Sequence, residues 1–121
     1  MTKSSDLRVR SFEFTVQIVR LCRYALMGDP IVRRLAFQLV DSVGSIGANL
    51  EESAAGQSKP DFIAKQCIAL KEARESHFWL RVIAATYPPA ASEVKRHLEE
   101  ANELIAMITA SIRTAKSNPG R

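Results

Sequence analysis

Two pairs of glutamates are, by type and spacing, the residues of this chain best suited to general acid or base chemistry. Glu72 and Glu75 are three residues apart, and so are Glu100 and Glu103, which places each pair on one face of a helix. A carboxylate pair acts as acid and base only in a cleft that shifts a pKa. Because both pairs fall outside the apolar stripes of their helices, we interpret them as solvated or interface charge.

Neither of the two histidines has the spacing of a metal ligand. The di-metal centres of helical proteins use Glu-x-x-His pairs, and neither His77 nor His97 has a glutamate three positions before it. The sequence also has no strand-turn-helix nucleophile motif and no glycine-rich loop for phosphate. We therefore expect a protein that is not an enzyme, with no catalytic residue, no metal and no cofactor.

Arginines near the N-terminus are the second group that could do chemistry. Residues 1–34 hold seven Lys and Arg against three Asp and Glu, whereas residues 35–121 hold ten of each, so the net charge of +4 arises in the first segment. Such a surface attracts phosphate groups without reading a base sequence. The candidate nucleic-acid contacts are Arg8, Arg10, Arg20, Arg23, Arg33 and Arg34.

A polar pocket between subunits is the alternative, and it would make the protein an enzyme or a small-ligand-binding protein. The candidate lining residues of this pocket are Asn49, Glu52, Glu72 and Glu75. A defined RNA or enzyme recovered with the chain would favour a scaffold function. A co-purifying metabolite would favour the pocket.

Amphipathic helices must position all of these side chains. At 121 residues, 46% hydrophobic and 25% charged, the chain has the size and composition of one soluble domain. Apolar periodicity, capping residues and Gly or Pro stops predict helices over about 8–27, 30–55, 59–87 and 91–116, with a flexible tail over 117–121. The short connections predict an all-α, up-down-up-down antiparallel four-helix bundle. Without a membrane-spanning run or a signal-peptide core, a cytoplasmic location is expected.

The apolar stripes also predict which side chains are buried. The third helix is expected to bury Ile63, Gln66, Leu70, Ala73, His77, Leu80, Ala84 and Tyr87. The fourth is expected to bury an uninterrupted stripe of Val94, Leu98, Ala101, Ile105, Ile108 and Ile112. Cys22 and Cys67 have apolar neighbours and belong to no CxxC pattern, so both are expected to be reduced core residues.

Two glycines inside the second helix indicate a close contact with another helix. Gly44 and Gly47 each cost a helix interior roughly 1 kcal/mol relative to alanine, and close approach of a neighbour is the usual compensation. In the third helix, Phe78 and Trp79 lie on either side of the core stripe and widen its apolar arc. We therefore expect a homo-oligomer whose candidate interface residues are Phe37, Gly44, Gly47, Phe78 and Trp79.

Three segments carry a resemblance to a known family. They are Ser45-Ile-Gly-Ala-Asn-Leu-Glu-Glu52, Gln57-Ser-Lys-Pro-Asp-Phe-Ile63 and Ile68-Ala-Leu-Lys-Glu-Ala-Arg-Glu75, the last followed by Trp79-Leu-Arg81. Through them the chain resembles the bacterial four-helix-bundle proteins first noticed as products of intervening sequences in large-subunit ribosomal RNA genes. The resemblance extends from Asp6-Leu-Arg-Val9 to Ile112-Arg-Thr-Ala-Lys116, and it departs at Arg10, where many relatives carry an aromatic residue.

The resemblance implies an antiparallel four-helix bundle that assembles into a ring-like homopentamer. It also implies similarity to the accessory protein of diversity-generating retroelements, a pentameric scaffold for reverse transcriptase and RNA. No catalytic residues come with it. The expected function is a non-enzymatic, homo-oligomeric scaffold, with RNA, DNA or a nucleic-acid enzyme as partner and no membrane.

Overall fold

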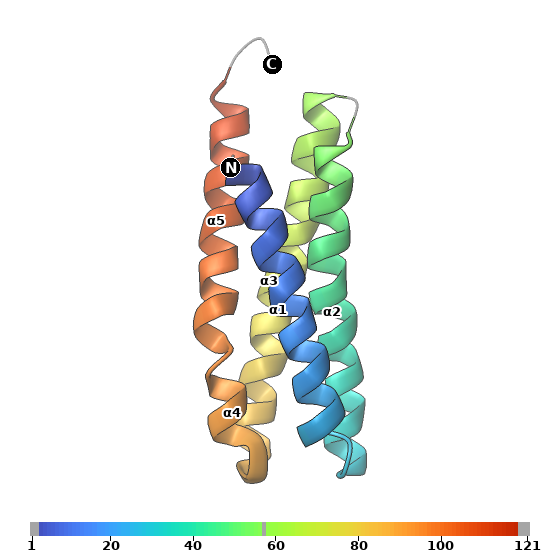
Figure 1. Ribbon diagram of the computed structural model, residues 1–121. Helices are drawn as coiled ribbons and strands as arrows, with labels where there is room; N and C mark the ends of the chain where they lie inside the picture. Colours follow the sequence, from blue (N-terminus) through green and yellow to red (C-terminus); the bar gives the residue numbers. More distant parts are fainter. Residues whose placement is uncertain (1–2, 57, 119–121) are drawn as a thin grey trace.

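The computed structural model describes residues 3–56 and 58–118, and these residues are almost entirely helical. The elements are α1 (Lys3–Ala25), α2 (Pro30–Ala54), α3 (Lys59–Thr86), the 3-10 turn η1 (Pro88–Ala90), α4 (Ala91–Lys95) and α5 (Leu98–Lys116), shown in Figure 1. The described ranges contain no strand, so the predicted all-α class is confirmed. None of their helices is long and apolar enough to cross a membrane. Of the tail expected over 117–121, residues 119–121 lie outside the described residues.

Local capping determines where α2 and α3 begin. Asp29 Oδ1 accepts hydrogen bonds from the backbone N–H groups of Ile31 and Val32, both at 3.0 Å, and Pro30 occupies a position that needs no N–H donor. At α3, Ser58 Oγ accepts a hydrogen bond from the N–H of Asp61 at 3.2 Å. Both helices therefore start directly after a side chain that satisfies their first donors.

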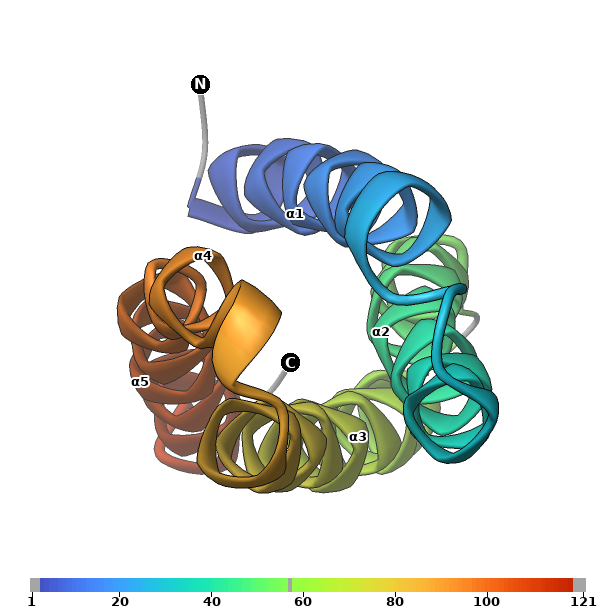
Figure 2. The ribbon, with the colours of Figure 1, turned by 90° about the horizontal axis from the view of Figure 1, so that it is seen from below.

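The long helices α1, α2, α3 and α5 lie side by side around a common core. In Figure 2, α1 and α3 occupy opposite corners, and each lies beside both α2 and α5. The core centre is filled by fully buried aliphatic side chains such as Leu39, Ile46, Leu80 and Ile108. The α1–α2 turn and α4 lie at one end of the molecule, and the α2–α3 turn lies at the other (Figure 1).

The buried face of α3 differs from the predicted one. Its buried residues are Gln66, Ala69, Ala73, Ser76, Leu80 and Ile83. The predicted core residues Ile63, Leu70, His77, Ala84 and Tyr87 are only half-buried. The physical reason is the packing of α3 on α2 through small and polar side chains. Ser76 Oγ donates to Ser42 Oγ at 2.9 Å, and Gln66 Nε2 donates to Ser53 Oγ at 3.0 Å.

The predicted fourth helix is also wrong in one respect, because it is divided into α4 and α5. The N–H groups of Arg96 and His97 bond to carbonyls three residues earlier, at 3.2 and 3.0 Å, which tightens the chain into a turn between the two helices. The stripe is consequently interrupted: Leu98 and Ile105 are half-buried, whereas Leu104 is fully buried.

The two cysteines do not share an environment. Cys22 is buried, as expected, and burial raises the pKa of its thiol to about 11. Cys67 is exposed on α3, so its predicted place in the core is wrong. The shifted buried face of α3 explains the error, since Gln66 rather than Cys67 points inward.

Gly44 and Gly47 have different surroundings. A Cβ added at Gly47 would lie 3.3 Å from Ser11 Oγ and 3.8 Å from Thr15 Oγ1, so α1 packs closely on this position. A Cβ added at Gly44 would have nothing within 4 Å. The close contact expected at both glycines is therefore made within the subunit at Gly47 only, and Gly44 leaves an open notch on the surface.

Alanine substitution should separate these two glycines. Gly44→Ala should raise the free energy of unfolding by up to about 1 kcal/mol, because alanine is the better helix former and its methyl meets nothing in the subunit. Gly47→Ala should gain less or lose stability, because its methyl presses on the buried Ser11 hydroxyl. Urea unfolding of both variants, at a chain concentration at which light scattering shows monomers, measures the difference, and equal gains would contradict the close packing at Gly47.

The stability of the fold should also depend on the protonation of His97. This ring lies half-buried 6.5 Å from the ring of Phe14, and burial, followed by the charge of Arg96, lowers its pKa below the ordinary 6.5. The unfolded chain therefore takes up the proton more readily. Stability is full above the ordinary pKa and falls as the pH drops below it.

In a His77→Gln background, which removes the other histidine, we expect urea unfolding to show a loss of stability between about pH 7.5 and pH 5. Adding His97→Gln should reduce that loss. The account of His97 fails if the loss is the same in both proteins.

Candidate functional site

The six arginines named as nucleic-acid candidates lie in two separate places. Arg10 forms a two-pronged pair with Glu100, with Nε to Oε2 at 3.1 Å and Nη2 to Oε1 at 2.6 Å, and this hydrogen bonding raises its pKa. Arg8 pairs with Glu51 at 3.7 Å. These contacts join α1 to α5 and to α2, respectively. Carboxylates already bind the guanidinium groups of Arg8 and Arg10, so these two arginines are poorly suited to bind phosphate.

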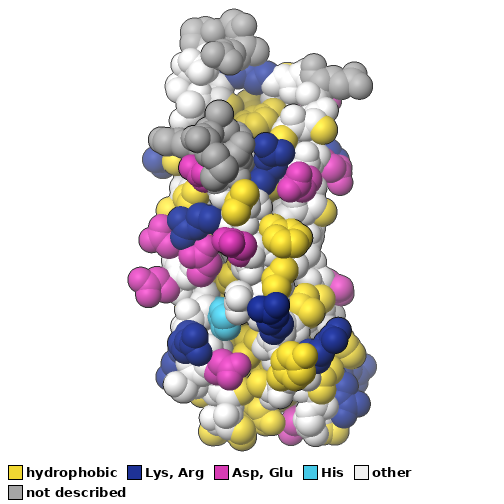
Figure 3. All heavy atoms as spheres, viewed as in Figure 1, with side chains coloured by type: hydrophobic (Ala, Val, Ile, Leu, Met, Phe, Trp, Pro, Cys, Tyr) yellow, Lys and Arg dark blue, Asp and Glu magenta, His cyan; other side chains and the backbone are white. Residues whose placement is uncertain are grey.

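The remaining four arginines, Arg20, Arg23, Arg33 and Arg34, are exposed around the α1–α2 turn. The antiparallel fold brings exposed Arg81, Lys95 and Arg96 to the same end. We call these seven residues the basic end. In Figure 3, Lys and Arg side chains gather toward the lower part of the molecule, and acidic side chains gather at mid-height over α5. The sequence alone did not single out Arg81, Lys95 and Arg96, because residues 35–121 carry no net charge.

The positive charge of the basic end is not neutralised locally. Within the described residues, none of its seven cations forms an ion pair with a carboxylate. Asp29 lies nearby but caps α2, and Arg33 Nε donates instead to the neutral backbone carbonyl of Met27 at 3.0 Å. The guanidinium of Arg33 is therefore positioned without losing its charge, which suits it to contact phosphate.

An apolar strip runs along the outer border of α1 and α2. It consists of Phe12, Val16 and Val19 from α1 with Phe37 and Gly44 from α2. Phe12 is 67% exposed and Phe37 is 55% exposed. Because Ser11 and Thr15 face Gly47, the neighbouring positions on both helices must turn outward along this border. Figure 3 shows hydrophobic side chains on this face of the molecule.

A second apolar area lies on α3, the helix opposite α1 in Figure 2, and it is exposed at Ile68 and Phe78 and half-buried at Trp79 and Val82. This α3 patch consists of Ile68, Phe78, Trp79 and Val82. Phe78 and Trp79 meet edge to face with their ring centroids 5.1 Å apart. The indole Nε1 of Trp79 is buried and has no hydrogen-bond acceptor among the described residues. The predicted interface residues thus divide between the apolar strip, which holds Phe37 and Gly44, and the α3 patch, which holds Phe78 and Trp79, while Gly47 packs against α1.

The residues of the alternative polar pocket line none of the described hollows of the isolated subunit. Asn49 Nδ2 donates to its own helix at Ser45 O, at 2.8 Å, and Glu52 pairs with Lys65 at 2.9 Å. Burial, followed by the charge of Glu75, raises the pKa of Glu72, but Glu75 itself is exposed. The described hollows of the molecule are lined by other residues.

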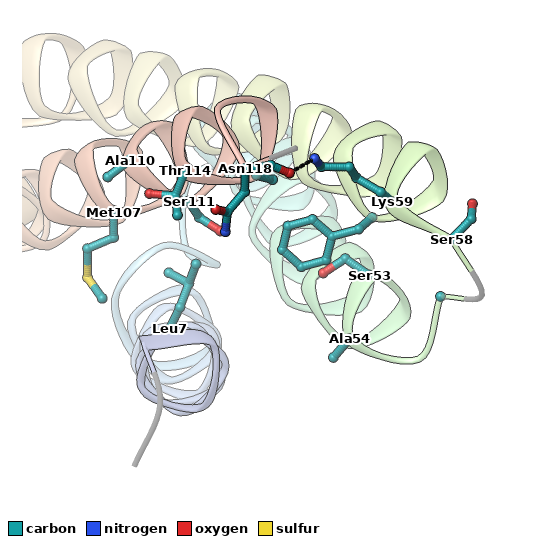
Figure 4. Close-up of a pocket in the computed structure, with 13 residues that line it drawn as sticks. Leu7, Ser53, Ala54, Ser58, Lys59, Met107, Ala110, Ser111, Thr114 and Asn118 are labelled. Carbon is teal, nitrogen blue, oxygen red and sulfur yellow. Dashed lines mark hydrogen bonds between the residues drawn. The ribbon is translucent and has the colours of Figure 1, made fainter. Parts of the chain in front are cut away.

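The largest of these hollows, about 630 Å³, opens at the end of the molecule that carries the α2–α3 turn. It exists because α1 begins below the ends of its neighbours, as Figure 1 shows. In Figure 4, Leu7 and Met107 lie on one side of it, and Lys59 donates to the backbone carbonyl of Asn118 on the other. Lys59 is the one charged group among its described lining residues, so an acid–base pair is missing there.

The described residues also contain no group of three or more His, Cys, Asp or Glu side chains that could hold a metal ion. The described surface offers three areas suited to binding: the basic end, the apolar strip and the α3 patch. All three are built on helices whose positions the core fixes.

Comparison with known proteins agrees with the segments that carry the resemblance. The family described as 23S rRNA-intervening sequence protein matches residues 3–110, from the start of α1 into α5. A solved structure from Bacteroides thetaiotaomicron, described as a protein with unknown function from the S23 ribosomal protein family, is 31% identical with a TM-score of 0.84. The match covers 93% of this chain and 99% of that one. No curated protein matches the chain. The chain therefore belongs to the family of 23S rRNA-intervening sequence proteins.

Proposed function

We propose that this protein is the subunit of a non-enzymatic, cytoplasmic scaffold: an antiparallel four-helix bundle that assembles into a ring, with five subunits as the favoured number. The scaffold holds RNA, DNA or a nucleic-acid enzyme at the basic end. The observation that carries the proposal is the apolar strip, because its two phenylalanines are more than half exposed in the isolated subunit. Burying a large apolar side chain contributes roughly 1.5–3 kcal/mol, so covering both rings strongly favours association.

The positions of the apolar strip and the α3 patch favour a ring over a symmetric dimer. They are separate surfaces of the subunit, one on α1 and α2 and the other on α3, so one copy can apply its strip to the α3 patch of the next. Such head-to-tail contacts close into rings when the rotation between copies permits. The notch at Gly44 gives room for a side chain of the neighbour.

Charge introduced into the apolar strip should dissociate the assembly. In the variant Phe12→Glu, Phe37→Glu, two carboxylates would have to be buried at the interface, which costs far more than the lost apolar contact. Light scattering should show the unmodified chain as an oligomer and this variant as a folded species of 13.4 kDa. The control is Ile31→Glu, which changes a side chain that is also 67% exposed but lies outside the strip. An unchanged mass for the double variant would rule out the strip as the interface.

Nucleic-acid binding follows from the uncompensated charge of the basic end. A single subunit offers seven cations, and each phosphate contact is weak and screened by salt. Several copies on one ring raise the effective concentration of these contacts for any chain that reaches more than one of them. The proposal therefore couples assembly to binding: the ring should hold nucleic acid more tightly than the monomeric variant does.

Reversing charge at the basic end should abolish binding without changing assembly. For Arg20→Glu, Arg33→Glu, Arg34→Glu we expect much weaker RNA and DNA binding at low salt and a shallower dependence of affinity on salt. The matched control is Arg74→Glu, Arg113→Glu, Lys116→Glu, an equal charge change at exposed positions outside the basic end. Salt titration by fluorescence anisotropy measures both, with light scattering to verify the mass of each. Equal affinities for the two triple variants would exclude the basic end as the contact surface.

A further inference from the structure

We infer that the basic end binds single-stranded rather than duplex nucleic acid, with the ring of Tyr24 as a platform for an unpaired base. This inference rests on the proposed nucleic-acid function and specifies the form of nucleic acid that is bound. It starts from Tyr24, an aromatic side chain that is 80% exposed on the last turn of α1. Nothing in the packing of the subunit requires a tyrosine there.

The surroundings of Tyr24 combine an aromatic face, a hollow and positive charge. A shallow hollow of about 340 Å³ runs along α1 and is lined by Val16, Val19, Arg20, Arg23 and Tyr24, together with Phe12 and Thr15. Aromatic rings bind bases by stacking, and arginines beside them bind the flanking phosphates. The hollow continues into the apolar strip, so Tyr24 lies at the rim of the proposed subunit interface.

Two further cations of the basic end are positioned by neutral partners. Arg81 Nε is hydrogen-bonded to Nδ1 of His77 at 3.2 Å, and its guanidinium lies over the ring of Phe78, 5.8 Å from the centroid. Arg33 donates to a backbone carbonyl. Neither contact cancels a charge, so both guanidinium groups remain attractive to phosphate along a path that leads away from Tyr24.

The shape of the basic end disfavours a duplex. Its cations come from the ends of α1, α3 and α4, the turn after α4 and the start of α2, so they form a blunt surface with no single helix projecting from it. Such a surface can contact the phosphates of a duplex, but it places no helix in a groove to contact the bases. Stacking on an exposed ring needs a base that is not already stacked and paired. A single strand can contact both the cations and the ring of Tyr24, whereas a duplex can contact only the cations.

Fluorescence anisotropy with three labelled probes tests the inference: an RNA strand of about 20 nucleotides, the DNA strand of the same sequence, and the RNA duplex. We expect the single strands to bind more tightly than the duplex at equal salt. Tyr24→Ala should weaken single-strand binding roughly 5-fold or more and leave duplex binding unchanged, because only the single strand can stack. Tyr24→Phe keeps the ring and should keep the affinity. Ile31→Ala truncates another exposed side chain of this end and should have no effect.

Light scattering must show that each variant has the mass of the unmodified protein. Equal binding of single strands and duplex with no effect of Tyr24→Ala would overturn the inference and leave the proposed nucleic-acid function intact. A loss of affinity in Tyr24→Phe as large as that in Tyr24→Ala would also overturn the inference and leave the proposed nucleic-acid function intact. If no probe binds at low salt, both the inference and the proposed nucleic-acid function are wrong.

Discussion

Helix α1 carries apolar side chains on two faces, and the subunit buries only one of them. The inner face places Phe14 and Ile18 in the core, where both are almost fully buried. The outer face contributes Phe12, Val16 and Val19 to the apolar strip. Because α1 approaches α2 closely at Gly47, the strip continues onto α2 up to the notch at Gly44. Removing this surface from water requires a second chain, and the proposed function follows from that requirement.

The pairing of α2 with α3 makes the subunit a rigid support for its surfaces. Ala69 and Ala73 are fully buried, and small side chains let the two helices approach closely. The hydrogen bonds from Ser76 and Gln66 to serines of α2 fix the rotation of α3, since a buried hydroxyl or amide without a partner is costly. That rotation points Phe78 outward and leaves the α3 patch on the surface of the subunit. One set of internal contacts therefore determines the position of the surface to which we propose that a neighbouring copy binds.

Sequence patterns were informative wherever the determinant is local. The carboxylate of Asp29 and the hydroxyl of Ser58 cap helices directly after them, and the helical periodicity identifies the all-α class. The buried face of α3 could not be predicted in this way. It consists largely of Gln66, Ser76 and two alanines, and polar or small side chains do not stand out in a hydropathy pattern. The division between α4 and α5 was missed because no glycine or proline marks the turn at Arg96 and His97.

The candidate site was predictable only in its N-terminal part. Four of its arginines stand out as a local charge excess, whereas Arg81, Lys95 and Arg96 belong to a segment with balanced charge. They reach the basic end only because the helices run antiparallel. Likewise, the pairing of Arg10 with Glu100, 90 residues away in the sequence, requires the tertiary structure, and it removes one predicted phosphate contact from consideration.

The central claim is that the apolar strip is buried by another copy of the chain. Sedimentation equilibrium of the unmodified protein at micromolar concentration, in nuclease-treated samples, tests it most directly. The account predicts one species whose mass is a multiple of 13.4 kDa, five-fold for the favoured ring. A single species of 13.4 kDa that persists as the concentration is raised would contradict it.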